Sequence, residues 1–174
     1  MEISGYLVGE SLSHTTRHAV HRARHVASGR DVILKRAARD YPLAEDVLRL
    51  ELERRLLERL RGPGIVELVG VEQLAGSPVL VLEDFAAQSL GDTPLPLDLQ
   101  HFFRIAPRIV AALARVHAAQ VIHKDIKPSN VLWHAETDTL KLIDFQLSAV
   151  VSRERRELKV GGQLEGSLPY LSPE

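Results

Sequence analysis

Residues 121–145 hold several side chains that could do chemistry together. This stretch contains the run His123-Lys124-Asp125-Ile126-Lys127-Pro128-Ser129-Asn130, and it ends on Asp144-Phe145. An amide and a carboxylate oxygen suit a hard divalent cation such as Mg²⁺, which prefers oxygen ligands. A second carboxylate and an ammonium group beside such a cation suit phosphoryl transfer, because that reaction depends on positioning and charge neutralisation.

The residues between these polar clusters predict a β-hairpin. Two short apolar runs, 131–133 and 140–143, flank a polar turn at 135–139, which is the pattern of two paired strands. Folding this hairpin places Asn130 and Asp144 near the same end. We therefore expect two carboxylates, an amide and a lysine to converge there.

The polar run resembles the catalytic loop of eukaryotic-type protein kinases, which usually reads H-R-D-L-K-P-x-N, and Ile143-Asp144-Phe145 resembles the start of their D-F-G motif. The resemblance implies that Asp125 accepts the proton of a substrate hydroxyl and that Lys127 neutralises charge on the transferred phosphoryl group. It also implies that Asn130 and Asp144 hold Mg²⁺. The implied activity is ATP-dependent phosphorylation of serine or threonine in protein substrates, with ATP and Mg²⁺ as cofactors.

Composition sets limits that agree with this reading. The chain has 174 residues, 45% hydrophobic and 26% charged, with a net charge of −1 and no cysteine. A near-neutral chain does not bind nucleic acid through bulk charge, and without cysteine it has no disulfide or thiolate metal site. No apolar run reaches membrane-spanning length and the first residues lack a signal-peptide core. We expect a cytoplasmic protein without a membrane span or a nucleic-acid partner.

The first half of the chain predicts five strands and one helix. The apolar runs expected to form strands are 6–8, 19–23, 32–35, 65–74 and 78–84. Between the third and fourth lies a leucine-rich stretch, 42–61, with an apolar stripe on one side and Glu–Arg pairs at helical spacing. Gly62-Pro63-Gly64 should end this helix. A second helix is expected over 97–120, with Pro107 kinking or splitting it.

Four histidines, at positions 14, 18, 21 and 25, recur at helical spacing and could suggest a metal site. The apolar residues interspersed among them alternate as strand positions would, and no carboxylate accompanies the cluster. We favour surface histidines on a pair of strands.

With the kinase resemblance, these elements imply an α+β fold: a five-stranded antiparallel N-lobe sheet with one helix, followed by a partial, mainly helical C-lobe. The implied domains are 1–85, the N-lobe with its hinge, and 86–174, whose first residues, 86–96, act as a linker. Lys35, which ends the third strand like the lysine of V-A-I-K, would contact the α and β phosphates of ATP. Glu53 would pair with it, and Glu51 is the alternative. The other residues implied to contact the nucleotide are Ser13, Val20, Leu82, Glu83 and Phe85.

Three positions depart from the kinase pattern. Registered on Val20, the glycines of the phosphate-covering loop are replaced by Ser13, Thr15 and His18, although glycine allows backbone amides to approach phosphate closely. Gln146 replaces the glycine of D-F-G. Lys124 replaces the catalytic-loop arginine and cannot clamp a phosphorylated activation loop through two parallel hydrogen bonds, so we predict weak dependence on such phosphorylation.

The last residues resemble the family's G-T-x-x-Y-x-A-P-E segment, which makes 144–174 an activation segment with hydroxyls at Ser152 and Ser167. Ser167 is expected to contact the substrate-binding loop. The family continues through further helices beyond this point, so we expect apolar surface of the 97–120 helix to be exposed. The chain also resembles the N-terminal kinase domain of large bacterial proteins that carry an ATPase module and a sensor histidine kinase, which would make further domains its partners.

Two other functions stay open at this stage. A pseudokinase that regulates an attached domain is favoured by the missing glycines and by Gln146. A small-molecule kinase, such as a relative of the aminoglycoside phosphotransferases, would share the fold. The segment S-L-P-Y-L-S-P-E argues for protein substrates instead.

Overall fold

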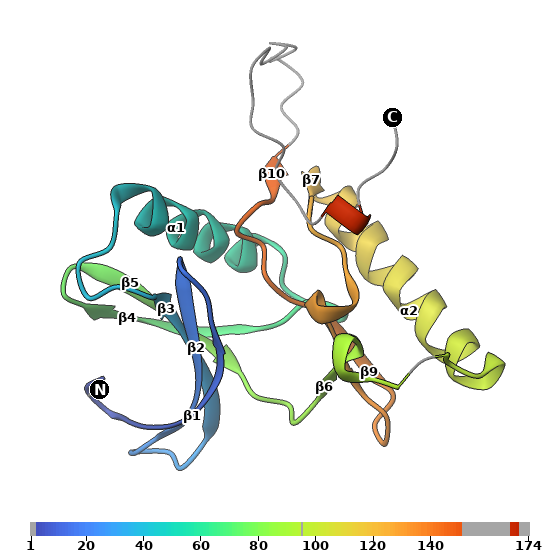
Figure 1. Ribbon diagram of the computed structural model, residues 1–174, viewed down its shortest axis with the longest axis horizontal. Helices are drawn as coiled ribbons and strands as arrows, with labels where there is room; N and C mark the ends of the chain where they lie inside the picture. Colours follow the sequence, from blue (N-terminus) through green and yellow to red (C-terminus); the bar gives the residue numbers. More distant parts are fainter. Residues whose placement is uncertain (1–2, 95, 151–167, 171–174) are drawn as a thin grey trace, which may run out of the picture. The chain divides into compact units, whose positions relative to one another are not determined.

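The computed structural model describes residues 3–94, 96–150 and 168–170. The chain forms two compact units, the first made of Met1–Arg61 and Val66–Ala86 and the second of Gly62–Ile65 and Ala87–Glu174. Figure 1 shows the order of the elements along the chain. Each unit is described separately below.

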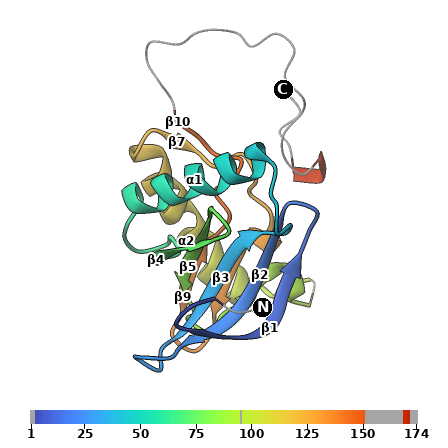
Figure 2. The same cartoon turned by 90° about the vertical axis from the view of Figure 1, so that its left-hand side faces the viewer.

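The first unit contains the predicted five-stranded sheet (Figure 2). Its strands are β1 (Tyr6–His14), β2 (His18–His25), β3 (Asp31–Ala37), β4 (Leu68–Leu74) and β5 (Ser77–Glu83). They pair in the order β1-β2-β3-β5-β4, and every neighbouring pair is antiparallel. The predicted strand that was expected to start at residue 65 begins at Leu68. The predicted fold class of this half of the chain is confirmed.

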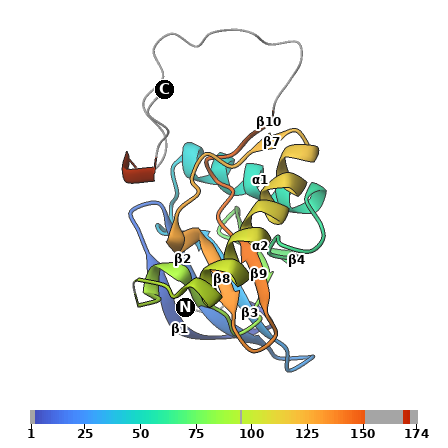
Figure 3. The same cartoon turned by 90° about the vertical axis from the view of Figure 1, so that its right-hand side faces the viewer.

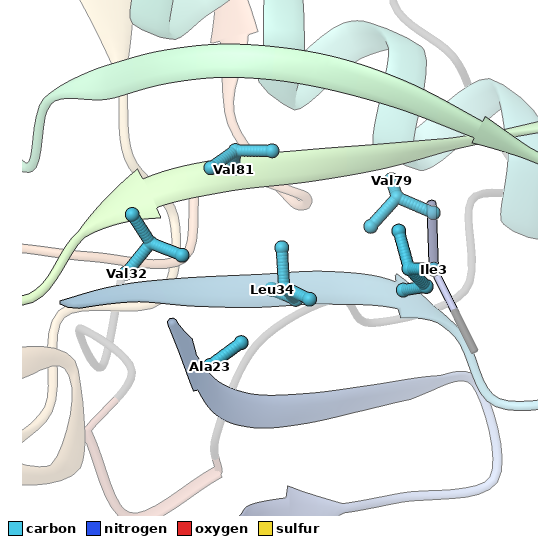
Figure 4. Packing of buried hydrophobic residues seen from close by; sticks show 6 residues of the cluster. All are labelled: Ile3, Ala23, Val32, Leu34, Val79 and Val81. Carbon is cyan, nitrogen blue, oxygen red and sulfur yellow. The ribbon is translucent and has the colours of Figure 1, made fainter. Parts of the chain in front are cut away.

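One face of the sheet carries an apolar core. Its buried members are Ile3, Ala23, Val32, Leu34, Val79 and Val81, and Figure 4 shows these side chains gathered between the strands and the N-terminal segment. Val32 and Leu34 alternate with residues of β3 that point to the opposite face, as the two-residue period of a strand requires. The sheet therefore presents two different faces, and Lys35 belongs to the other one.

Helix α1 (Ala44–Arg59) packs on β3, β4 and β5. Its buried residues are Asp46, Leu50, Glu53, Leu56 and Leu57. The predicted apolar stripe is therefore only partly right, because Leu43 precedes the helix as its exposed N-cap and two acidic residues join the buried side. The helix ends before Gly62 and Gly64, whose positive φ angles of 129° and 84° a helix cannot accommodate.

The four histidines lie on the β1–β2 pair, as predicted. His14 is the last residue of β1, whereas His18, His21 and His25 belong to β2 and are half-buried. Their sequence spacing therefore does not reflect a helical face.

The second unit is built around α2 (Leu99–Ala118) and the predicted hairpin of β8 (Val131–His134) and β9 (Thr139–Leu142), which Figure 3 shows beside each other. The smaller elements are β6 (Gln88–Ser89), η1 (Leu90–Asp92), β7 (Val121–Ile122), η2 (Pro128–Asn130), β10 (Ala149–Val150) and η3 (Leu168–Tyr170). β6 pairs with β8 and β10 with β7, both antiparallel. The stretch 86–96, expected to be a plain linker, thus contributes a strand and a 3₁₀ turn.

Helix α2 runs through Pro107 as one helix, so Pro107 does not split it, which was one of the two expected effects beside a kink. Asp98 caps its start by accepting a hydrogen bond from the backbone N–H of His101 at 2.8 Å. Only Ile105, Ala112 and Val116 are buried. The expected exposed apolar surface is present, with Leu99 74%, Phe103 67% and Val110 65% exposed.

Residues Gly62–Ile65 join the second unit, although the predicted boundary at residue 85 placed them in the first. The N–H of Leu142 in β9 donates to the carbonyl of Gly64 at 2.8 Å, and Ile65 forms a parallel bridge with the same residue. Gly64 also lies against α2, where a Cβ would be 2.7 Å from the Cβ of Ala112. This contact requires glycine.

Candidate active site

A buried ion pair joins β3 to α1 in the first unit. The Nζ atom of Lys35 lies 2.9 Å from Oε1 and 2.8 Å from Oε2 of Glu53. Lys35 is 4% exposed and Glu53 is fully buried. Two opposite charges that are both removed from water fix each other's position closely, since each needs the other as a partner. The pairing predicted from the sequence is therefore present.

The alternative partner, Glu51, is occupied elsewhere on α1. Its two carboxylate oxygens accept hydrogen bonds from Arg54 at 2.7 and 2.8 Å, and Arg55 adds a third at 3.1 Å. The hydrogen bonds from Arg54 are the main reason that the pKa of Glu51 falls to about 2. Glu51 thus belongs to the charged face of the helix.

Strand register places several predicted nucleotide contacts in one row across the sheet. Ser13 in β1 pairs with Val20 in β2, which pairs with Lys35 in β3, which pairs with Leu80 in β5. Directly paired residues of antiparallel strands project from the same face. Leu82, two residues after Leu80, faces the same way. The sheet therefore brings these positions to the face on which Lys35 meets α1.

The β1–β2 turn, where the kinase pattern expects glycine, is closed by side chains. The hydroxyl oxygen of Thr15 accepts hydrogen bonds from the N–H groups of Arg17 and His18 at 3.2 and 3.0 Å. The Arg17 guanidinium reaches α1, lying 2.8 Å from Glu45 and 3.9 Å from Asp46. The backbone carbonyl of Arg17 accepts a hydrogen bond from the N–H of Ala38 at 3.0 Å. The turn is thus attached to the rest of its unit at two further points.

The segment predicted as the hinge follows β5. The N–H of Glu83 donates to the carbonyl of Glu67 at 3.0 Å, and its carboxylate accepts from the N–H of Glu67 at 2.7 Å. Asp84 is held by Arg22 of β2 at 2.7 Å. Leu82 is buried and Phe85 half-buried. The N–H of Glu83 thus already has a protein partner.

In the second unit, the hairpin brings the predicted catalytic residues together. The N–H of Ile143 donates to the carbonyl of Asn130 at 3.1 Å, so Asp144 follows directly from a contact with the loop. Val131 pairs with Leu142 at the same end of the hairpin. The hairpin thus places Asn130 and Asp144 near the same end, as expected from the sequence.

Within the loop, Asp125 is the centre of a compact polar cluster. Its Oδ2 atom lies 2.8 Å from Nζ of Lys127 and accepts a hydrogen bond from Nδ2 of Asn130 at 2.9 Å. The same amide nitrogen donates to the carbonyl of Asp125 at 2.8 Å. Asp125 and Asn130 are 6% and 5% exposed. A carboxylate held in this way has a fixed orientation, which general-base or orienting chemistry requires.

The side-chain amide of Asn130 has one polar atom, its oxygen, that could bind a cation. Both of its donor hydrogens serve Asp125, so its oxygen is turned away from that carboxyl and forms no hydrogen bond within the described residues. An amide oxygen together with the Asp144 carboxylate fits a hard divalent cation that completes its shell with phosphate and water. In the described part of the chain, no group of three or more His, Asp or Glu residues could hold a metal.

Sequence reasoning gave His123 no role, yet it organises the loop. Its ring is 1% exposed, with Nε2 3.1 Å from the carbonyl of Ile143 and Nδ1 accepting from the N–H of Asp125 at 3.3 Å. The ring packs on Phe145, with centroids 4.6 Å apart, and Ser148 donates to its backbone carbonyl at 3.1 Å. The sequence did offer one indication that His123 has a role, namely its position two residues before Asp125.

Two residues of this site have left-handed backbones. Lys124 has a φ of 67° and Asp144 a φ of 65°. This region is unfavourable for side chains with a Cβ, especially a long one such as lysine. Gln146, at the glycine position of D-F-G, is 8% exposed. Ser152 and Ser167, the predicted hydroxyls of the activation segment, lie outside the described residues.

Comparisons with known proteins agree with this geometry. The family model described as "Protein kinase domain" matches residues 8–174. The DNA damage-responsive serine/threonine-protein kinase RqkA of Deinococcus radiodurans is 34% identical over 89% of this chain and 24% of its own length. The serine/threonine-protein kinase PknL of Mycobacterium tuberculosis is 29% identical over 98% of this chain and 43% of its own. A putative CBL-interacting protein kinase 13 of Oryza sativa is 33% identical over 96% of this chain and 33% of its own.

The fold and the loop define a phosphotransferase-type domain, and the chain belongs to the protein kinase family. It spans less than half the length of each of these relatives. The family as a whole uses ATP and a divalent metal. No helix in the described residues is both long and apolar enough to cross a membrane.

Proposed function

We propose that this chain is the kinase domain of an ATP-dependent protein kinase that phosphorylates serine or threonine hydroxyls. The observation that carries the proposal is the Asp125–Lys127–Asn130 cluster, because it positions a carboxylate, an ammonium group and an amide oxygen for one reaction. The names of the relatives support serine and threonine as acceptors.

Each unit supplies part of the chemistry. In the first, Lys35, fixed by Glu53, binds the α and β phosphates, and Ser13 and Val20 lie over the nucleotide. Leu82 borders the adenine, and Glu83 and Phe85 line the hinge beside it. This unit corresponds to the N-lobe with its hinge, and residues after 86 to a partial C-lobe.

In the second unit, Asp125 orients the substrate hydroxyl and takes its proton as the oxygen attacks the γ-phosphorus. Lys127 neutralises charge on the transferred group. Asn130 and Asp144 would hold the divalent cation, which we assign as Mg²⁺ because two protein oxygens leave room for phosphate and water. The bound cation supplies charge neutralisation at the phosphates.

We further propose that the domain works in the cytoplasm within a longer signalling polypeptide, whose other domains are its partners. The greater lengths of the relatives support this. A cysteine-free chain of net charge −1 suits a reducing compartment and does not suggest nucleic acid as a partner.

The test is transfer of radiolabelled phosphate from ATP and Mg²⁺ to a generic basic protein by the full chain and by Asp125→Asn. We expect the substitution to reduce turnover by about 10³-fold or more, since the orienting carboxylate is lost while the loop keeps its shape. Equal, negligible turnover in both would identify a pseudokinase. Phosphorylation of an aminoglycoside with proteins left untouched would identify a small-molecule kinase.

A further inference from the structure

A cavity in the first unit has no part in the proposed function. It has a volume of about 280 Å³ and lies where β3 ends, beside the β4–β5 turn. Arg36 and Val79, which line it, belong to the sheet face that carries the apolar core, because they lie at even spacing from Leu34 and Val81. Lys35 projects from the opposite face. The cavity is thus separated by the sheet from the face proposed to bind nucleotide.

Two buried polar atoms at this cavity lack hydrogen-bond partners within the described residues. They are Oγ of Ser77 and Nε of Arg36. Ser77 is only 6% exposed, and both residues line the cavity. Both atoms are closed to water in this structure, so a ligand in the cavity would pair with them only after the Arg36 and Ser77 side chains turn towards it. A buried polar atom without a partner costs about 1–3 kcal/mol, which favours that turn. Both can donate a hydrogen.

The charge around the cavity favours an anion. Arg36 and Arg39 both line it, and Arg39 is exposed. The one acidic lining residue, Asp40, lies 3.6 Å from Arg36, but its side chain is 84% exposed and its charge is therefore screened by water. The positive charge of Arg36 also acts on its neighbours. Burial is the main reason that the pKa of His21 is lowered, and the charge of Arg36 lowers it further.

The remaining wall of the cavity is apolar. The residues that supply it are Ala37, Leu74, Ala75, Pro78 and Val79. The volume of the cavity is just below the usual range of small-molecule sites, about 300–1,000 Å³. A ligand that fits must be small, with an anionic head for the two arginines and the serine and a short apolar part for the β4–β5 side.

We propose that this cavity binds a small amphiphilic oxyanion, a carboxylate or a phosphate monoester with a short apolar group. The Nε–H of Arg36 and the hydroxyl of Ser77 donate to the oxyanion, and Arg39 adds charge. The site is independent of catalysis, so its test does not depend on the proposed kinase activity.

The experiment follows the Arg36 Nε–H and Ser77 backbone N–H signals in ¹H–¹⁵N spectra of the full chain. Inorganic phosphate, phenyl phosphate and benzoate are titrated at constant ionic strength, with a non-hydrolysable ATP analogue and Mg²⁺ present to occupy the proposed nucleotide site. We expect saturable shifts, with phenyl phosphate or benzoate binding more tightly than inorganic phosphate. Tighter binding of phenyl phosphate assigns a phosphoryl ligand, and tighter binding of benzoate a carboxylate.

Ser77→Ala should weaken binding at least tenfold, because it removes a hydrogen bond to a charged group. Arg36→Lys, which keeps the charge but loses Nε–H, should weaken it similarly, as read from the Ser77 backbone signal. Arg61→Gln, an exposed arginine outside the cavity, is the matched control and should change nothing.

A urea unfolding midpoint of Ser77→Ala without added anion should equal or exceed that of the parent chain, since an unpaired hydroxyl has been removed. This separates lost binding from lost folding. Absence of saturation with all three probes at about 10 mM would overturn the proposal, as would titrations that are unchanged by Ser77→Ala. Equal affinity for inorganic and phenyl phosphate would overturn the apolar part of it.

Discussion

At the scale of single residues, the attraction between Lys35 and Glu53 has to offset the free-energy cost of removing two charges from water. Both side chains are almost fully buried and within 2.9 Å of each other. Such a pair adds little net stability relative to apolar residues of similar size, although the loss of one partner strands a buried charge. The pair therefore serves position more than stability.

This yields a double-mutant prediction. Lys35→Met and Glu53→Leu should each lower the free energy of unfolding by about 3–5 kcal/mol, whereas the double variant should be within about 1 kcal/mol of the parent. Urea denaturation measures all three. Glu51→Gln, which removes a carboxylate from the exposed face of the same helix, is the control and should cost under about 1 kcal/mol. Additive losses in the double variant would show that the charges are not coupled.

At the scale of elements, the β1–β2 turn replaces glycine flexibility with side-chain attachments. Thr15 closes the turn and Arg17 connects it to the first turn of α1. A turn that is already ordered has less conformational entropy to lose when it contacts phosphate. The missing glycines are therefore compatible with nucleotide binding.

We expect Arg17→Ala to raise the KM for ATP by about two- to fivefold, the range that an exposed ion pair can contribute. kcat should change little, because Arg17 belongs to the unit proposed to bind the nucleotide, whereas the Asp125 cluster belongs to the other unit. Arg24→Ala, which breaks a comparable exposed pair between β2 and Asp31 at 2.7 Å, is the control. Initial-rate kinetics measure both constants. If Arg17→Ala and the control have the same KM for ATP, the Arg17–Glu45 pair has no role in nucleotide binding.

The contact between Gly64 and α2 gives a second element-scale prediction. Gly64→Ala adds a Cβ 2.7 Å from that of Ala112 at a φ of 84°. We expect a loss of about 2–4 kcal/mol, from left-handed strain plus overpacking. Gly76→Ala has a similar φ of 78° with nothing within 4 Å, so it isolates the strain.

In Gly64→Ala/Ala112→Gly the two Cβ atoms no longer meet, and part of the stability should return, as measured by urea unfolding. If Gly64→Ala costs no more than Gly76→Ala, the close approach is not tight in solution.

At the scale of the whole molecule, nucleotide binding should appear as stability. At 100 times the dissociation constant, an ATP analogue with Mg²⁺ should add about 2.7 kcal/mol, or roughly 5–10 °C in Tm for a chain of this size. Asp125→Asn should keep the shift and Lys35→Met should lose most of it. Differential scanning fluorimetry tests this, and a parent chain without any shift would favour a nucleotide-free interaction module.

Local patterns were sufficient to predict most elements of both units. Strand alternation gave all five strands of the sheet, and the family register selected Glu53 over Glu51. Long-range contacts could not be read in this way. The association of Gly62–Ile65 with β9, the Arg17 attachment and the position of the His123 ring depend on partners 20 or more residues away in the chain. Apolar spacing also overestimated the buried face of α1, because the ion pair occupies part of it.

The left-handed backbones of Lys124 and Asp144 carry a local cost in stability. Glycine at either position would relieve that unfavourable geometry, but glycine has no side chain to offer a cation. The proposed ligand at position 144 and the most comfortable backbone there are therefore alternatives, and this chain has the ligand.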